Sequence, residues 1–339
     1  MSQTPKKFPF PFLRLPMLAM KSIFSKMELQ TMFFLSVTST RVKNALNSTL
    51  LKNFFFIDCD FCTDKVINLE LAARPCLRLI LNDRRAPEGT SSFEIQNMMF
   101  KFYIADPQYQ NIELKFDGTF DVGAVVIMTH LAEAFRLPKI SMGFDVGVQA
   151  DVASVLLRHA KSLSLPMVDI KLNTELAEVT PAEVYREFLN AGPGIEQELS
   201  LICKSARDFT FRTASPQDFK LDTLYIRDGH WVHLEDFMEC KDVTIDSTRF
   251  NREMYCMTDQ RLNEFFKLWK GSECRLEQLE IDYCYSKVKL KFKWITMGLE
   301  GTNYRKPGYL QSIIIKREDG KKAEITLTKE KKLYLEVIN

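Results

Sequence analysis

One pair of cysteines in this sequence has the spacing of a reactive or metal-binding site. Cys59 and Cys62 form a C-x-x-C pair, which occurs in zinc sites and in redox centres. A zinc site needs two further ligands at matching spacing, and no second pair follows. A redox pair needs a lowered thiol pKa, whereas Asp58, Asp60 and Asp64 disfavour the thiolate by like charge. We therefore predict two structural cysteines at the end of a strand.

Two histidines form the second candidate for chemistry. His230 and His233 flank Trp231, and two carboxylates, Glu235 and Asp236, follow closely. Imidazoles and carboxylates could surround a metal ion, but a three-residue spacing outside a long helix is not a zinc-hydrolase signature and no third ligand is evident. We predict a loop anchored by a buried Trp231. A metal-dependent enzyme that uses the two histidines is kept as an alternative.

A stripe of lysines is the third candidate. Lys287, Lys289, Lys291 and Lys293 alternate with the apolar residues of Val288–Trp294, which predicts a strand with one basic face. Such a face could meet an acidic protein surface or a phosphate backbone. We interpret it as a solvated face whose lysines block pairing at a sheet edge.

The sequence contains none of the common nucleotide-binding or nucleophile motifs. No G-x-G-x-x-G follows a predicted strand, and neither a G-K-[ST] loop nor a G-x-S-x-G elbow is present. The candidate residues therefore do not assemble into a recognisable catalytic site.

Composition indicates a globular protein with an almost neutral charge. The 339 residues are 46% hydrophobic, and 46 Lys plus Arg oppose 44 Asp plus Glu, which leaves a formal charge of +2. These values exclude wholly disordered and collagen-like chains. A near-neutral chain is also not a bulk polyanion binder, although a local basic patch remains compatible with it.

The cysteines and the hydrophobic segments predict an intracellular protein. Eight cysteines follow no repeated spacing of a disulfide scaffold, which favours reduced thiols in the cytoplasm or nucleus. Arg14 and three prolines interrupt the apolar stretch 8–20, so we do not expect a signal peptide. No uncharged apolar run approaches the ~20 residues of a membrane span.

The first fifty residues predict three short helices with too much apolar surface. Leu18, Ile23, Phe24 and Met27 recur at helical spacing, a second set crowds residues 32–37, and 44–51 forms a third stretch. Three such helices cannot bury their apolar surface against one another, which implies a partner surface.

The remainder of the chain predicts alternating strands and helices. Helices are expected from a Thr180-Pro181-x-Glu183 capping box to Gly192, from a Thr258 cap to Gly271, and from Asp151 through His159. Seven strands are expected from apolar triplets: Cys76, Leu79, Leu81; Tyr109, Ile112, Leu114; Leu137, Ile140, Met142; Met167, Ile170, Leu172; Leu221, Leu224, Ile226; Cys240, Val243, Ile245; and Leu276, Leu279, Ile281. This order is typical of an irregular leucine-rich-repeat solenoid or another parallel sheet. The last thirty residues predict antiparallel strands around an Asp319-Gly320 turn.

Both ends of the chain resemble one known family. Residues 12–16 (FLRLP), Ile23-Phe24, Met27, Met32-Phe33, Leu35 and the Ser39-Thr40-Arg41 end resemble an F-box, in the nematode form that opens with F-P-F-L-x-L-P. The segments Leu224-Tyr225-Ile226, Trp231, Val243-Thr244-Ile245, the helix Leu262–Trp269 and Leu276–Ile281 resemble the F-box-associated domain that is paired with it. The final strands, with Ile315–Gly320, resemble the C-terminal end of the same family.

The resemblance implies an α+β fold in which a three-helix F-box precedes an irregular leucine-rich-repeat-like α/β domain that ends in antiparallel strands. The expected boundaries are 8–48 for the F-box, 49–75 for a connecting segment and 76–339 for the α/β domain, with an F-box-associated region at 205–339.

The resemblance implies a substrate-recognition subunit of an SCF-type cullin–RING ubiquitin ligase, without catalytic residues, cofactor or metal. Its expected partners are the S-phase-kinase-associated adaptor, the cullin and a protein target that the sequence does not name; neither a membrane nor a nucleic acid is expected. Ten residues would bind the adaptor: Leu13, Leu15, Pro16, Ile23, Phe24, Met27, Met32, Phe33, Leu35 and Val42.

Two positions depart from the F-box pattern. Glu28-Leu29 stands where many F-boxes carry Asp-Pro, and Val42 stands where an aromatic residue is common. Both changes reduce what the helices offer to an adaptor. A ligase-independent protein-interaction module is therefore kept as the alternative function.

Overall fold

The fold is that of a computed structural model of the chain. It describes residues 14–50, 55–62, 65–71, 77–82, 90–106, 111–136, 138–174, 178–246, 257–284, 289–304 and 309–338. The chain divides into two compact units. Met1–Ser141 and Arg158–Pro166 form the first, and Met142–Leu157 and Met167–Asn339 form the second.

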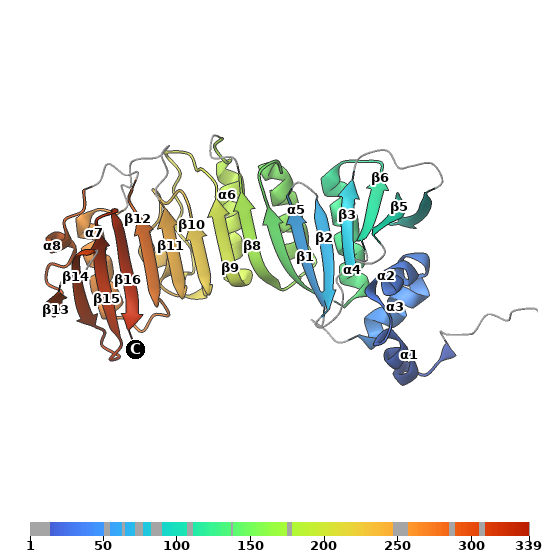
Figure 1. The fold of residues 1–339 in the computed structure, drawn as a ribbon, viewed down its shortest axis with the longest axis horizontal. Coiled ribbons are helices and arrows are strands. Elements are labelled where there is room, and N and C mark those ends of the chain that lie inside the picture. The colour runs from blue at the N-terminus through green and yellow to red at the C-terminus, as the bar shows by residue number, and fades with distance from the viewer. Residues whose placement is uncertain are drawn as a thin grey trace, which may run out of the picture. The chain divides into compact units, whose positions relative to one another are not determined.

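The first unit begins with three helices and continues mainly as strands (Figure 1). Its helices are α1 Met17–Phe24, α2 Leu29–Thr38, α3 Thr40–Thr49 and α4 Phe120–Ala134. Its strands are β1 Phe55–Phe61, β2 Val66–Leu71, β3 Leu77–Asn82, β4 Ser91–Ile95, β5 Met98–Asp106 and β6 Asn111–Phe116. The pairings β1–β2, β2–β3, β6–β5 and β5–β4 are antiparallel, whereas β3 and β6 are parallel. Two further elements, β7 Lys139–Phe144 and α5 Ala150–Ser162, contribute residues to both units.

The second unit alternates strands with helices and then becomes a meander. Its elements in chain order are β8 Met167–Asn173, α6 Ala182–Ala191, η2 Gly192–Gly194, β9 Ile195–Ile202, η3 Pro216–Asp218, β10 Thr223–Ile226, η4 Leu234–Phe237, β11 Asp242–Asp246, α7 Asp259–Lys270, β12 Gln278–Asp282, α8 Phe292–Ile295, β13 Gly301–Tyr304, β14 Tyr309–Lys316, β15 Lys322–Thr328 and β16 Lys332–Ile338. Strands β8 to β12 are parallel in sequence order. β16 pairs antiparallel with β12 and is followed by β15, β14 and β13.

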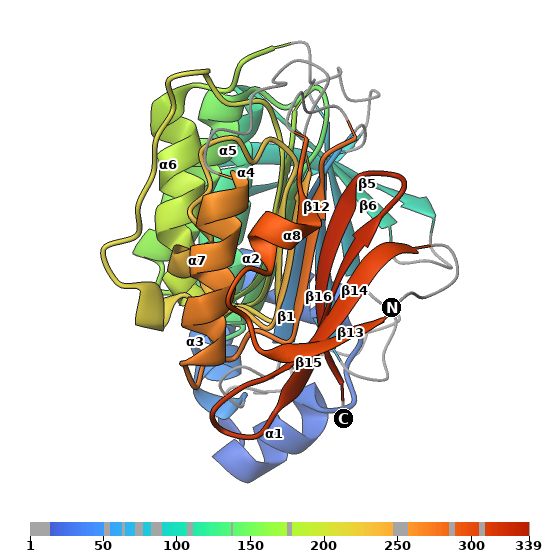
Figure 2. The ribbon, with the colours of Figure 1, turned by 90° about the vertical axis from the view of Figure 1, so that its left-hand side faces the viewer.

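Helices cover one face of the parallel sheet and leave the other open. In Figure 2, α6 and α7 lie on the same side of the strands. Strand side chains point alternately to the two faces, so the buried Leu224, Ile226, Val243 and Ile245 form the covered face. The open face carries polar rows in register, among them Tyr225 opposite Thr244, Thr244 opposite Glu280 and Glu280 opposite Tyr334.

The expected fold class is confirmed. Three helices precede a leucine-rich-repeat-like α/β part, and the chain ends in antiparallel strands. Each of the seven apolar triplets lies at a strand, β3, β6, β7, β8, β10, β11 and β12, with Cys76, Tyr109 and Leu137 themselves outside the described residues. The helix α7 also begins as predicted, because the Thr258 hydroxyl accepts a hydrogen bond from the Arg261 N–H at 3.3 Å.

The predicted capping box at α6 is wrong. Pro181, and not Thr180, occupies the N-cap position, and no side chain caps the helix. The Thr180 N–H instead donates to the Lys204 carbonyl at 2.8 Å, next to a parallel bridge between Val179 and Lys204, so the chain is still extended at Thr180 and the helix begins later. The third N-terminal helix begins earlier than the expected stretch 44–51. Ser39 caps it, so α3 starts at Thr40.

The predicted lysine-bearing strand over Val288–Trp294 is wrong in its described part. Residues 289–291 have no regular structure, and Phe292–Ile295 form the short helix α8; Lys287 lies outside the described residues. The physical reason is that Phe292 and Ile295 are both buried, and a helix places residues three apart on one face. The Lys291 N–H is bonded to the Asp259 carboxylate at 3.0 Å and not to a neighbouring strand.

The predicted burial of Trp231 is confirmed, and an aromatic cluster surrounds it. Its indole lies edge-on to Tyr185, Phe209 and Phe211, with ring centroids 5.6, 5.3 and 5.9 Å away. These rings tie the loop before η4 to α6 and to the segment after β9. Edge-to-face pairs of this kind add roughly 0.5–1.5 kcal/mol each beyond the area they bury.

Replacing Trp231 by alanine should destabilise the protein by about 3–5 kcal/mol, because a large aromatic leaves a cavity in a packed core. Urea unfolding followed by far-UV circular dichroism measures the change. Trp294→Ala is the matched control, since this indole is 48% exposed and its loss should cost less than about 1 kcal/mol. Equal unfolding midpoints for the two variants would contradict the packing role of Trp231.

Candidate functional site

The helix α1 exposes large apolar side chains. Leu18 is 82% exposed, Met17 55% and Ile23 36%, while Phe24 in the last turn is fully buried. No acidic residue lies in the first turn. Neighbouring exposed apolar residues on one short helix are typical of a surface that a partner covers.

Of the ten residues predicted to bind an adaptor, nine are described, and they divide into three groups by exposure. Leu13 lies outside the described residues; Pro16 and Ile23 are exposed, and Leu15, Met27 and Leu35 are half-buried. The remaining four, Phe24, Met32, Phe33 and Val42, are buried. In the described conformation these four pack the first unit, so any direct contact with a partner comes from the other members. Their binding role stays a prediction.

Aromatic rings dock α2 on the strands of the first unit. Phe34 of α2 lies 4.7 Å from Phe102 of β5, measured between ring centroids, and 6.4 Å from Phe93 of β4. Phe33 lies 5.9 Å from Phe93 and 6.0 Å from the imidazole of His130 in α4. The apolar surface that the three helices cannot bury among themselves is therefore buried in part against the body of the same unit.

Polar contacts reinforce this docking. The Lys43 Nζ lies 2.7 Å from the Glu133 carboxylate, and the Asn47 amide donates to the Glu133 carbonyl at 2.5 Å. The Arg136 guanidinium donates to the Leu50 carbonyl at 2.9 Å, just past the end of α3. Side chains near the end of α4 thus satisfy carbonyl and ammonium groups of α3 and of the residue that follows it.

A buried histidine forms the centre of the same contact. The Ser36 hydroxyl donates to the Phe33 carbonyl at 2.7 Å and lies 2.8 Å from His130 Nε2. When the single hydroxyl proton is directed at the carbonyl, the Ser36 oxygen can accept a hydrogen bond from an imidazole that carries its proton on Nε2. Burial, followed by the charge of Lys43, lowers the pKa of His130 to about 4, although Glu133 opposes the shift.

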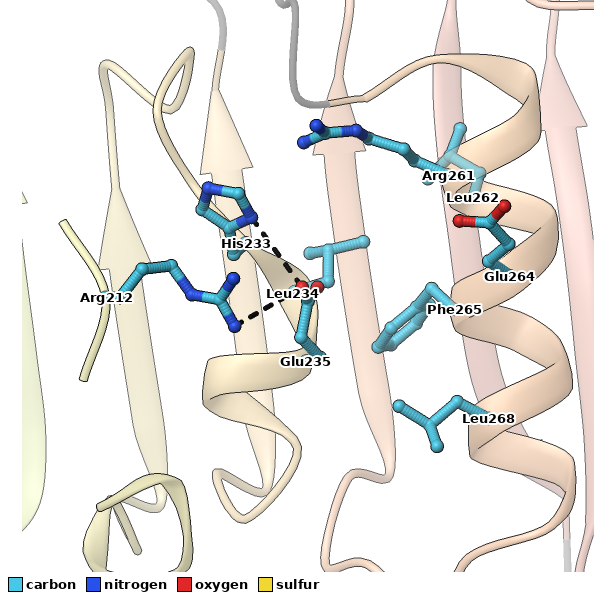
Figure 3. A pocket seen from close by; sticks show the side chains of 9 residues that line it. All are labelled: Arg212, His233, Leu234, Glu235, Arg261, Leu262, Glu264, Phe265 and Leu268. Carbon is cyan, nitrogen blue, oxygen red and sulfur yellow. Dashed lines mark ion pairs between the residues drawn. The ribbon is translucent and has the colours of Figure 1, made fainter. Parts of the chain in front are cut away.

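A pocket of about 380 Å³ opens in the second unit (Figure 3). One wall comes from α7, and the other comes from Arg212 and the beginning of η4. The residues that line it are Arg212, His233, Leu234, Glu235, Arg261, Leu262, Glu264, Phe265 and Leu268. Leu268 is 50% exposed at its edge. The pocket combines an apolar floor with charges of both signs on its rim.

The rim of the pocket is held by a buried carboxylate. Asp236 accepts two hydrogen bonds from the Arg212 guanidinium, at 2.8 and 2.9 Å, and a third from the Thr213 N–H at 3.2 Å. The same Arg212 lies 3.5 Å from Glu235, and His233 lies 3.6 Å from Glu235 (Figure 3). A bidentate Arg–carboxylate pair fixes the guanidinium in one plane, so the charged rim is preorganised.

The two histidines contact different groups, and they do not form a common site with the C-x-x-C pair. His230 lies 3.3 Å from the buried Asp228 carboxylate and 3.1 Å from the Ala206 carbonyl, whereas His233 faces the pocket. Among the described residues no cluster of three possible metal ligands occurs. Cys59 is buried in β1 and Cys62 follows the strand end, as predicted; burial, followed by Asp58, raises the pKa of Cys59.

Comparison with known protein families gives two matches. The F-box domain matches residues 12–54, and the F-box associated family matches residues 210–281. No curated protein and no solved structure matches the chain. Along the described residues no helix has the length and apolar content to cross a bilayer.

The two matches correspond to the two sites. Helices α1 to α3 lie within the F-box match, and every residue that lines the pocket lies within the F-box associated match. The chain therefore carries an F-box domain followed by an F-box-associated domain, as its sequence resemblance predicts. The expected boundaries 8–48, 49–75 and 76–339 stay predictions.

The pKa of His130 predicts how stability depends on pH. In the unfolded chain the imidazole takes up a proton near pH 6.5, whereas in the folded chain it stays neutral until about pH 4. Its contribution is therefore fully present above pH 6.5 and is lost as pH falls through this window, by about 3 kcal/mol in total.

Urea unfolding at pH 7, 5.5 and 4.5 measures this loss. In His130→Gln the amide can still donate to Ser36 but does not titrate, so the variant should lose less stability over the same interval. If both proteins lose the same free energy, His130 is not responsible for the pH dependence.

Proposed function

We propose that this protein, with its F-box and F-box-associated domains, is a substrate-recognition subunit of an SCF-type cullin–RING ubiquitin ligase. Helices α1 to α3 bind the S-phase-kinase-associated adaptor, which in turn binds the cullin, and the second unit binds a protein target. The observation that carries the proposal is the apolar surface of Met17, Leu18 and Ile23, exposed on helices that are otherwise docked on the first unit.

The proposed mechanism is positioning. A target held by this subunit encounters the charged conjugating enzyme at a raised effective concentration, so the transfer of ubiquitin needs no catalytic group from this chain. F-box and F-box-associated families are adaptors as a class, which supports this view. We accordingly assign no catalytic residue, cofactor or metal, and we expect the protein in the cytoplasm or nucleus.

The docked helices give the adaptor a preformed binding surface. The ring contacts of Phe33 and Phe34, with the Lys43–Glu133 ion pair, hold α2 and α3 before any partner arrives. Less conformational entropy is then lost on binding. This supports ligase association over the ligase-independent alternative.

The pocket of the second unit is the proposed target site. Its apolar floor, Leu262, Phe265 and Leu268, suits a bulky apolar side chain, and its rim can bind charges of either sign. Its volume lies within the usual range of ligand pockets, roughly 300–1,000 Å³. The open polar face of the parallel sheet offers additional contact area.

Replacing Leu18 and Ile23 together by aspartate should reduce adaptor binding at least about tenfold, because buried apolar anchors of an interface cost about 1–4 kcal/mol each when removed. Recovery of purified adaptor on the immobilised full chain measures the effect. Both side chains are exposed, so the fold should persist. Val122→Asp with Val146→Asp adds the same charge at exposed aliphatic positions outside α1 to α3 and should leave recovery unchanged. If the wild-type chain recovers no adaptor, the ligase-independent function is favoured.

Replacing Leu268 by aspartate should abolish target capture and leave adaptor recovery unchanged, because a charge at the edge of the pocket floor opposes an apolar ligand group. Proximity labelling in cells, with and without proteasome inhibition, identifies proteins near the wild-type chain and the variant. Val179→Asp is the matched control, since Val179 is equally exposed in the same unit but lies away from this pocket. Capture that survives Leu268→Asp would place the target site elsewhere.

A further inference from the structure

A basic and aromatic patch lies on and beside α8, and all of its residues except Lys267 lie outside both family matches. Three lysines are exposed along 289–293, and Trp294 and Met297 follow with 48% and 53% of their surfaces exposed. Lys267 of α7 completes the group, because its side chain lies against Gly298. We call this set the Trp294 patch; its members are Lys267, Lys289, Lys291, Lys293, Trp294 and Met297.

The patch is held rigidly by the residues beneath it. The buried Asn263 of α7 donates from its Nδ2 to the carbonyls of Ile295 and Met297, both at 2.8 Å. Phe292 and Ile295, the first and last residues of α8, are buried, and α8 lies alongside α7 in Figure 2. The exposed indole is therefore presented on a turn that is already formed, so little backbone entropy is lost when a ligand binds there.

The ammonium groups of the patch are not used in ion pairs within the described part of the chain. No described carboxylate forms an ion pair with Lys267, Lys289, Lys291 or Lys293. Because residues 289–295 do not form a strand, the lysines also do not block pairing at a sheet edge. Tryptophan is enriched among the residues that dominate binding at interfaces, because the indole adds a large apolar area. Lysines beside it add charge complementarity to an acidic partner.

The size and border of the patch favour one class of partner. The Asp259 carboxylate lies at the Lys291 N–H, so an acidic group adjoins the cations, and Glu300, three residues after Met297 in the chain, is almost fully exposed. A nucleic acid or an anionic membrane presents negative charge over a long distance and would meet these carboxylates. We propose that the Trp294 patch binds a short acidic protein segment that carries an apolar side chain, with the carboxylates on the lysines and the apolar group on Trp294 and Met297.

Direct binding to the full chain tests this proposal. The probe is a fluorescein-labelled peptide of about twelve residues, in which Asp and Glu flank a central Leu-Leu, read by fluorescence anisotropy. Reversing Lys289, Lys291 and Lys293 to glutamate should weaken binding by about tenfold or more, and Trp294→Ala should weaken it several-fold. Raising the salt concentration from about 0.05 M to about 0.3 M should also weaken the wild-type interaction.

A matched variant separates the patch from net charge. Lys316→Glu, Lys322→Glu and Lys329→Glu change the charge of the chain equally at exposed positions on or beside β14 and β15, and should bind the peptide like the wild type. A peptide with Asn and Gln in place of Asp and Glu should not bind. Thermal melting verifies that each variant folds, and if the triple reversal does not fold, Trp294→Ala alone decides.

Several results would overturn the proposal. They are no peptide binding, equal binding of the neutral peptide, or equal loss in the matched variant. Tighter binding of a single-stranded RNA or of phosphatidylserine vesicles, abolished by the same triple reversal, would assign the patch to a polyanion instead. The test involves neither adaptor nor ligase, so its failure is independent of the proposed ligase function.

Discussion

The burial of α2 is the constraint on which the N-terminal part of the structure depends. Ten residues that include two adjacent phenylalanines, a methionine and two leucines cannot be covered by two short neighbouring helices. In the first unit, β4, β5 and α4 cover the apolar side chains Phe33 and Phe34 of α2. The buried polar groups at this contact, Ser36 and His130, satisfy each other. The apolar surface left over is that of α1, and it is this remainder that is available to a partner.

In the second unit, the strands form a scaffold, and the helices carry residues of its candidate binding sites. The alternation of buried and half-buried residues along β10 to β12 makes one face of the sheet a core. On that face α7 has three roles: Phe266 and Trp269 pack inward, Phe265 forms the pocket floor, and Asn263 holds the turn of α8. One amphipathic helix thereby connects the packing of the unit to both of its candidate binding surfaces.

Sequence reasoning succeeds where the local pattern and the burial agree. The apolar triplets predict β8 and β10 to β12 because each strand buries alternate residues. It misses β9, where an additional residue at the register shift near Ile195 widens the apolar spacing. It also misassigns α8, since an alternating pattern cannot reveal that Phe292 and Ile295 are buried on one side by α7. The pocket could not be predicted, because Arg212 and Arg261 are far apart in the sequence and no motif connects them.

Residues on the open face of the parallel sheet can be substituted without disturbing the core, whereas residues on the covered face cannot. In each strand, the residues that face the helices and those that face outward alternate, so Tyr225, Thr244 and Glu280 lie in one outward row while their chain neighbours form the core. A substitution in this row alters what a ligand meets and leaves the packing under α6 and α7 untouched. The outward row can therefore change in sequence without any change in the residues that form the core.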